Sequence, residues 1–184
     1  QERAEHLEPL AARAQIRTFH SFGSWFLRRY AEEAGLEPSF TVYDDDDSAS
    51  LIMKAMPGMT KKQANSAAHK IALCKDYCLY PEDDLSSVDS DGAFSEVYAA
   101  YQKRLRATGN ADFGDLIMLP VKILESNPVI RREMQYRFRV IMVDEYQDSN
   151  VAQFKLLQAV SGVQENSGTY VCVVGDDDQS IYKF

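Results

Sequence analysis

Hydrophobic residues recur at helical spacing through the first 110 residues of the chain. An early set of aromatic residues falls on one face of a predicted helix, which Gly35 should end: Phe22, Trp25, Phe26 and Tyr30. A later set forms the clearest amphipathic helix, which Gly109 and Asn110 should end: Phe94, Val97, Tyr98, Tyr101 and Leu105. Between these helices the pattern predicts a short helix over residues 51–56, a longer helix over residues 64–78 and a loop over residues 79–91.

Short apolar runs replace this spacing towards the end of the chain. Residues 140–143 read Val-Ile-Met-Val, and a second run ends at Gly175. Uninterrupted runs of this kind are typical of parallel strands that are covered on both faces. From Asp112 onwards helical and strand patterns alternate, which indicates βαβ units. Residues 15–19 predict a further strand and residues 2–13 the end of a helix. The expected fold is therefore α/β, with a helical segment over about residues 24–110 inserted into it.

Acidic residues directly follow both apolar runs. The first run leads into Asp144-Glu145-Tyr146-Gln147-Asp148, and the second into residues 175–179, which read Gly-Asp-Asp-Asp-Gln. In open α/β sheets, ligands bind at the carboxyl ends of the strands. One or two carboxylates together with substrate phosphates are the usual ligands of Mg²⁺ in proteins. A second acid beside the ligand can orient or deprotonate a water molecule.

Four motifs in this chain resemble those of a known enzyme family. Residues 144–148 resemble the Walker B motif, DExQD, of the UvrD/Rep/PcrA group of superfamily 1 DNA helicases. Residues 174–182 are similar to the motif III that follows it in that family. Residues 17–22 resemble motif Ib, and residues 112–116 resemble the D-F-x-x-L element. All four occur in the family's order.

The resemblance implies a fold and a domain division. It implies part of a P-loop NTPase (RecA-like) parallel sheet with an inserted all-helical subdomain. Residues 1–23 would belong to the first motor domain (1A), residues 24–110 to the helical insertion (1B-like), and residues 111–184 to the return to 1A. None of the nine glycines lies in the phosphate-cradling pattern G-x-x-x-x-G-K-[ST], which precedes motif Ib in the family. The chain is therefore expected to be a piece of a helicase that hydrolyses no ATP alone.

The resemblance also assigns residues to a nucleotide site, with ATP and Mg²⁺ as cofactors. Asp144 would hold Mg²⁺, and Glu145 would be the catalytic base that activates the attacking water. Gln179 would sense the γ-phosphate and is therefore counted with both the catalytic and the nucleotide-binding residues. Gln147 and Asp148 would border the nucleotide and relay its state to DNA. Alternatively, their side chains satisfy backbone groups of the loop.

A second group of residues is assigned by resemblance to DNA. Tyr182 and Phe184 would stack on single-strand bases, although both rings could instead be ordinary core. Thr18 and His20 would lie along the DNA backbone, and the alternative for His20 is a hydrogen-bonded structural role. Phe19 and Phe22 are expected in the core. Asp112 is expected to cap the following helix.

Composition restricts the function further. The formal net charge of −8 argues against a general electrostatic binder of nucleic acid. DNA contact would then come from local basic clusters such as Lys61-Lys62 and Lys103-Arg104-Arg106. The acidic runs at residues 44–47 and 82–84 are expected to be a helix start and a loop. Cys74 and Cys78 are expected to serve packing and not metal binding. No membrane-spanning stretch or signal peptide is present, and together with the resemblance this favours the cytoplasm.

The predicted function is that of a fragment of an ATP-dependent 3′-to-5′ DNA helicase or translocase, and the polarity rests solely on the resemblance. The expected partners are single-stranded DNA, duplex–single-strand junctions and proteins of DNA repair or replication. One alternative is a non-catalytic module that binds DNA or recruits a partner. Others are a metal-dependent nuclease that uses the same carboxylates, or part of a helicase-nuclease subunit.

Overall fold

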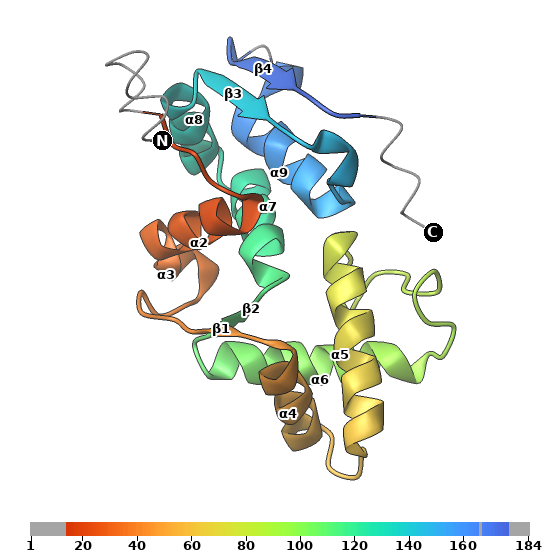
Figure 1. Ribbon diagram of the computed structural model, residues 1–184. Coiled ribbons are helices and arrows are strands. Elements are labelled where there is room, and N and C mark those ends of the chain that lie inside the picture. Colours follow the sequence, from red (N-terminus) through yellow and green to blue (C-terminus); the bar gives the residue numbers. More distant parts are fainter. Residues whose placement is uncertain (1–13, 166, 177–184) are drawn as a thin grey trace.

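The computed structural model describes residues 14–165 and 167–176 of the 184-residue chain. The helices are α2 (Phe19–Arg29), α3 (Ala31–Ala34), α4 (Asp45–Ala55), α5 (Lys61–Asp76), α6 (Ala93–Ala107), α7 (Asp115–Ser126), α8 (Pro128–Arg137) and α9 (Val151–Ser161). The strands are β1 (Val42–Tyr43), β2 (Ala111–Asp112), β3 (Val140–Val143) and β4 (Tyr170–Val173), and 3-10 turns occur at η2 (Tyr146–Asp148) and η3 (Val163–Glu165). Figure 1 shows α4, α5 and α6 grouped apart from the remaining helices, with β1 and β2 between the two groups.

Both pairs of strands are parallel. β3 pairs with β4 so that Val140 lies opposite Tyr170 and Val143 opposite Val173, and α9 lies between them in the chain. This is the predicted βαβ unit. β1 and β2 pair over only two residues each. β1 leads into the group of helices α4 to α6, and β2 follows that group. Their short ladder therefore holds the two connecting segments side by side. The described residues therefore form an α/β protein with two small parallel sheets.

The prediction that the strand over residues 140–143 is covered on both faces is wrong for the described residues. Val140 is 61% exposed and Met142 is 74% exposed, whereas Ile141 packs against the hydrophobic core. Side chains alternate between the two faces of a strand. One face of the β3–β4 pair therefore rests on the core beside α9, and no described element covers the other (Figure 1).

The predicted strand over residues 15–19 is also not formed. Residues 14–18 are irregular and exposed, and Phe19 is the first residue of α2. The hydroxyl of Thr18 accepts a hydrogen bond from the backbone N–H of Ser21 at 3.2 Å, which caps the helix. The capping preference of Thr18 thus decides the local conformation, since no described strand pairs with this segment. The predicted helix end at residues 2–13 lies outside the described residues.

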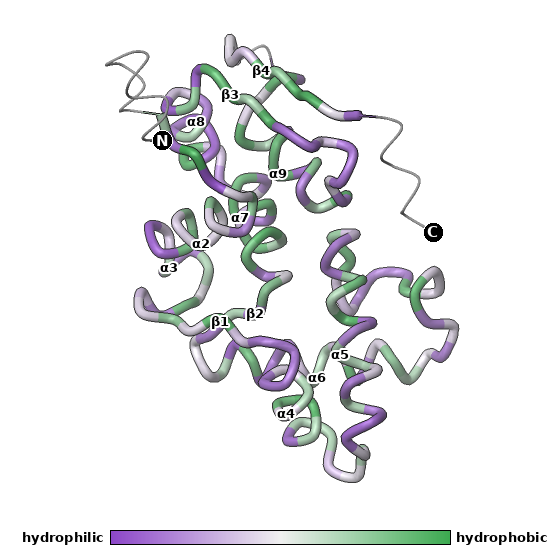
Figure 2. Tube along the Cα trace, viewed as in Figure 1, coloured by the Kyte–Doolittle hydropathy of each residue, from purple (hydrophilic) through white to green (hydrophobic). Residues whose placement is uncertain are grey.

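The hydrophobic core divides into two clusters. The first is built mainly by α2, α7, α8 and α9 and includes Phe26, Met118, Leu124 and Met134, each at most 1% exposed. The second is built by α4, α5 and α6 and includes Ile52, Tyr98, Tyr101 and Leu105, again each at most 1% exposed. Figure 2 shows hydrophobic residues concentrated along α7 and along β3 and β4. Phe26, Leu36 and Phe40 belong to the first cluster, so the hydrophobic core changes from the first cluster to the second at β1 and β2.

Local sequence signals explain where the helices of the second group begin and end. Asp44 and Asp47 form a reciprocal capping box at the start of α4, which confirms that this acidic run begins a helix. Thr60 and Gln63 do the same for α5. The short helix predicted over residues 51–56 is the second half of α4. Within the predicted loop, the acidic run at residues 82–84 forms neither helix nor strand.

Candidate functional site

The two acidic segments meet at the carboxyl ends of β3 and β4. The backbone N–H of Val174 donates to the carbonyl of Val143 at 2.8 Å, and the N–H of Tyr146 donates to the carbonyl of Val174 at 2.9 Å. The pairing of the strands thus continues past both strand ends. Residues 144–148 and 174–176 form one edge, as the parallel arrangement predicts.

Gln147 fastens these two segments through its side chain. Its amide nitrogen donates to a carboxylate oxygen of Glu145 at 2.6 Å, and its amide oxygen accepts from the backbone N–H of Asp176 at 3.1 Å. A Cβ atom on Gly175 would lie 2.7 Å from the same amide oxygen. A residue with a side chain at position 175 would therefore displace Gln147. These contacts match the structural alternative for Gln147, a side chain that satisfies loop backbone, and they also place it beside Glu145.

Asp144 and Glu145 are exposed at the start of this loop. Glu145 has a φ of 52°, in the left-handed region that residues other than glycine seldom adopt. Its backbone N–H donates to a carboxylate oxygen of Asp144 at 3.0 Å. Strained conformations of this kind are concentrated at functional sites. Asp148 is exposed, and its backbone N–H donates to the carbonyl of Glu145 at 3.0 Å within the same turn.

The loop offers a limited set of metal ligands. Among the described residues, no three His, Cys, Asp or Glu side chains come together as a ready-made metal site. The carboxylate of Asp144 supplies hard oxygen donors, which suit Mg²⁺ and not a soft metal. Mg²⁺ usually keeps several waters and takes one or two protein carboxylates together with phosphate oxygens. The residues present fit that pattern, with phosphate and water completing the coordination.

A stacked aromatic pair lies at the other predicted site. The His20 imidazole stacks on the ring of Phe113, with centroids 3.8 Å apart and an interplanar angle of 19°. Burial lowers the pKa of His20, so at neutral pH the imidazole is uncharged. Phe113 is 58% exposed, which leaves its ring accessible to a ligand. Phe113 was not among the residues predicted to contact DNA. The available signal was an aromatic residue between acidic residues in the D-F-x-x-L element.

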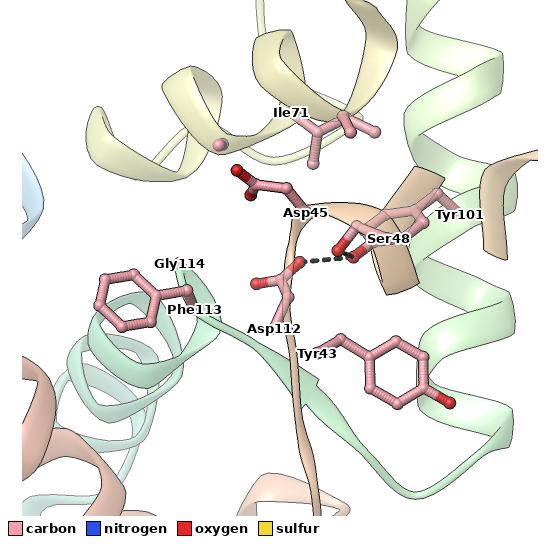
Figure 3. Close-up of a pocket in the computed structure, with 10 residues that line it drawn as sticks. Tyr43, Asp45, Ser48, Ile71, Tyr101, Asp112, Phe113 and Gly114 are labelled. Atoms are coloured by element: carbon pink, nitrogen blue, oxygen red, sulfur yellow. Dashed lines mark hydrogen bonds between the residues drawn. The ribbon is translucent and has the colours of Figure 1, made fainter. Parts of the chain in front are cut away.

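A buried ionic cluster includes the acidic residues on either side of Phe113 in the sequence. The ammonium of Lys75 lies 2.5 Å from Asp112 and 2.8 Å from Asp115. The hydroxyl of Tyr101 donates to Asp112 at 2.8 Å and lies 3.0 Å from the hydroxyl of Ser48. Figure 3 shows the Asp112 carboxylate facing Ser48 and Tyr101, whereas the Phe113 ring points away from them.

Asp112 and Asp115 also organise the start of α7. The carboxylate of Asp112 accepts the backbone N–H of Asp115, the first residue of α7, at 2.9 Å, although the N-cap position of this helix is Gly114 and not Asp112 as predicted. Burial alone would raise the pKa of Asp115. The attraction of Lys75 and Arg106 outweighs burial, and the pKa lies below its usual value. Asp115 is therefore ionised in the folded protein at neutral pH.

The basic residues of the helical group differ in whether they are exposed to solvent or paired within the protein. Lys61 and Lys62 are exposed at the start of α5, and Lys103 and Arg104 are exposed on α6. Arg106 is different, because one of its terminal nitrogens lies 2.8 Å from Asp115 and the other donates to the carbonyl of Asn110 at 3.1 Å. Arg106 is therefore held by contacts within the protein, whereas Lys103 and Arg104 of the same predicted cluster are exposed.

The cysteines confirm one prediction and qualify another. Cys74 and Cys78 are buried, and burial raises the pKa of each thiol to about 11, which is consistent with packing. Only Cys74 lies in α5, because the helix ends at Asp76.

Gln179, Tyr182 and Phe184, to which nucleotide and DNA contacts were assigned, lie outside the described residues. Within the described part of the chain, no helix is long and apolar enough to cross a membrane.

The fold and the site define an α/β protein with an acidic loop at the carboxyl ends of two parallel strands and a helical group joined beside it. Residues 1–184 match the UvrD/REP helicase N-terminal domain, and the chain belongs to this family. The resemblance found in the sequence is thereby confirmed.

Three relatives illustrate the similarity. The ATP-dependent DNA helicase UvrD1 of Mycobacterium tuberculosis is 38% identical over 182 residues, which cover 92% of this chain and 24% of the relative. The ATP-dependent DNA helicase PcrA of Bacillus subtilis is 36% identical and covers 97% of this chain and 24% of its own length. The ATP-dependent DNA helicase Rep of Escherichia coli is 33% identical, with 92% and 25% covered. The chain thus spans about a quarter of the length of these relatives.

Proposed function

We propose that this chain is part of an ATP-dependent DNA helicase that moves 3′ to 5′ along single-stranded DNA and unwinds duplexes. The observation that carries the proposal is the meeting of residues 144–148 with residues 174–176 at the carboxyl ends of β3 and β4. The names of the relatives, all ATP-dependent DNA helicases, support ATP and DNA as ligands. The polarity, a role in repair or replication and a cytoplasmic location are inferences from family resemblance.

In this proposal the acidic loop works on the terminal phosphate of ATP. Asp144 would hold Mg²⁺ together with the phosphates, and the ion when bound would neutralise charge that develops there. Glu145 accepts a proton from the attacking water. The contact between Gln147 and Glu145 supports this role, since the amide fixes one oxygen of the base in place. Asp148 and Gln179 complete the nucleotide side of the site, and Gln179 contacts the γ-phosphate.

The DNA side of the proposal uses the surface around His20. Thr18 and His20 lie along the phosphate backbone, and Tyr182 and Phe184 stack on bases. We add Phe113, because an exposed ring that already stacks on His20 offers a base a second aromatic surface. The exposed cations at Lys61-Lys62 and at Lys103-Arg104 would meet the duplex at a junction.

We further propose that the family's two subdomains divide this chain at its short ladder. Motor domain 1A would include residues 1–43 and 111–184, and the 1B-like helical subdomain would include residues 44–110. The packing of residues 26–40 with α7 supports a boundary at β1, later than residue 24. The pairing of β2 with β1 through Ala111 and Asp112 supports residue 111 as the point where the chain re-enters motor domain 1A.

The decisive experiment is DNA-stimulated ATP hydrolysis by a full-length protein that carries this chain. Glu145→Gln should lower kcat by on the order of 10²–10⁴ and leave nucleotide binding intact, which is the range for losing a positioned base. Glu32→Gln, on exposed α3, is the matched control and should leave kcat unchanged. Wild-type kinetics for Glu145→Gln would remove Glu145 from catalysis. DNA binding without turnover would favour the non-catalytic module, and metal-dependent DNA cleavage would favour a nuclease.

A further inference from the structure

A hydrogen bond connects Asn150, which begins α9 just after the acidic loop, to the helical group. The side-chain amide of Asn150 donates to a carboxylate oxygen of Asp76 at 2.6 Å, although the two residues are 74 positions apart. Asn150 follows the η2 turn after one intervening residue. Asp76 is the last residue of α5. The bond therefore runs from the end of the loop that begins with Asp144 to the end of one helix of the second core.

Asn150 is held firmly in this position. Its side-chain oxygen accepts the backbone N–H of Gln153 at 2.9 Å, and the side chain of Gln153 accepts the N–H of Asn150 at 3.3 Å. This capping box fixes the start of α9. The amide oxygen serves the helix and the amide nitrogen serves Asp76, so both ends of the side chain are used. The side chain of Asn150 therefore links the start of α9 to the end of α5.

The residue next to Asp76 reaches the other predicted site. Lys75 forms ion pairs with Asp112 and Asp115, which lie on either side of Phe113 in the chain. Gly114 packs directly against the stem of Lys75, where an added Cβ would lie 2.8 Å from the Lys75 Cβ. Lys75 is therefore ion-paired with and packed against the segment that presents the Phe113 ring to His20.

Lys75 and Asp76 are consecutive residues in the last turn of α5. Asp76 is half-buried, and burial raises its pKa. A hydrogen bond to a partly desolvated carboxylate contributes more than one in water, and losing it leaves a desolvated group without that donor. The end of α5 is consequently tied tightly on both sides.

We propose that Lys75 and Asp76 are positioning residues, which couple the acidic loop after β3 to the His20–Phe113 pair through the end of α5. This inference rests on the proposed function, which assigns ATP to the acidic loop and single-stranded DNA to the His20–Phe113 pair. Coupling of this kind makes occupancy of one site change the behaviour of the other. The Asn150–Asp76 hydrogen bond is the element that can be broken without touching either site.

Asn150→Asp is the informative variant. A carboxylate at position 150 still caps α9, because Asp and Asn are about equally good N-caps. It cannot donate to Asp76, and it brings two carboxylates together. Asp76→Asn combined with Asn150→Asp reverses the polarity of the bond, since the amide introduced at position 76 can donate to the carboxylate introduced at position 150. Asn127→Asp is the matched control, because Asn127 caps α8 through the N–H groups of Val129 and Ile130.

The measurement is the ratio of ATP turnover with and without single-stranded DNA, in the full-length protein that carries this chain. We expect Asn150→Asp to lower this ratio about 5-fold or more, the lower end of typical coupling, with basal turnover unchanged. The double variant should recover the wild-type ratio. Asp76→Asn alone and Asn127→Asp should both stay near wild type, since the first keeps an acceptor oxygen for Asn150. Thermal unfolding of each variant verifies that all are folded.

Each outcome decides the matter. A wild-type ratio for Asn150→Asp overturns the inference and leaves the proposed function standing. A low ratio that the double variant does not recover also overturns it, because the effect then belongs to position 150 and not to the bond. Loss of folding in Asn150→Asp with recovery of both folding and ratio in the double variant supports the bond. A wild-type protein without DNA-stimulated turnover overturns the proposed function and the inference together.

Discussion

The ammonium of Lys75 lies 2.8 Å from the carboxylate of Asp115, and each side chain is only 1% exposed. Lys75 belongs to the helical group and Asp115 begins α7, so this ion pair crosses between the two hydrophobic cores. Removing two charges from water is costly, and the attraction compensates only when the remaining polar atoms are also bonded. Lys75 also donates to Asp112, and Asp115 also accepts the backbone N–H of Asp112 and forms an ion pair with Arg106.

Truncating the cation should therefore destabilise the chain strongly. Lys75→Met keeps the length of the side chain but leaves Asp112 and Asp115 without their buried counter-charge. We expect the free energy of unfolding, measured with urea, to fall by about 3–5 kcal/mol, the cost of breaking a buried ion pair. Lys62→Met on the same helix is the control, because Lys62 is exposed, and it should change stability by no more than about 0.5 kcal/mol. Equal losses for both variants would refute the assignment.

The same cluster predicts sensitivity to acid. The folded pKa of Asp115 lies below its usual value, so the carboxylate contributes stability that is fully present above the unfolded pKa of about 3.9. That contribution is lost as the pH falls through the lower, folded pKa. Asp115→Asn should be less stable than wild type at pH 7, and the difference should narrow below about pH 4. A difference that stays constant from pH 7 down to acid unfolding would contradict the ion pair.

A close helix contact predicts the effect of a single methyl group. A Cβ atom on Gly23 of α2 would lie 1.7 Å from the carbonyl oxygen of Leu116 in α7. Gly23→Ala should therefore force the helices apart and reduce stability by about 1–3 kcal/mol, as overpacking does. Gly92→Ala is the control, because nothing lies within 4 Å and the backbone is α-helical there. It should change stability by no more than about 0.5 kcal/mol, and thermal unfolding of both variants tests the contrast.

Much of the helical part of this fold could be predicted from sequence, because its signals are local. The apolar spacing of α6 and the acidic run that begins α4 each act within a few residues. The strand expected at residues 15–19 failed for the opposite reason. A strand needs a partner from elsewhere in the chain, whereas Thr18 caps a helix with its own neighbour Ser21.

In the candidate site too, features that depend on contacts between distant residues were harder to predict. The meeting of the two acidic segments followed from two strand patterns and the rule for parallel sheets. The role of Lys75 could not be predicted, since a lysine in an amphipathic helix normally faces water. Its burial depends on Asp112 and Asp115, about 40 positions away. Phe113 was missed because its exposure follows from the burial of the acids beside it.

Phe113→Ala tests the DNA surface without disturbing the core. Because the ring is 58% exposed and contacts His20 by stacking, its removal should change stability little. If a base stacks there, affinity for single-stranded DNA should fall by about 1–3 kcal/mol, roughly 5- to 150-fold, whatever the sequence of the strand. Tyr136→Ala is the matched control, because this aromatic on α8 is 81% exposed and lies outside the proposed DNA surface. Fluorescence anisotropy with labelled oligonucleotides of two base compositions measures both variants. A loss of equal size for Tyr136→Ala would mean that exposed aromatics bind DNA without a defined site, and no loss for Phe113→Ala would remove the His20–Phe113 pair from DNA binding.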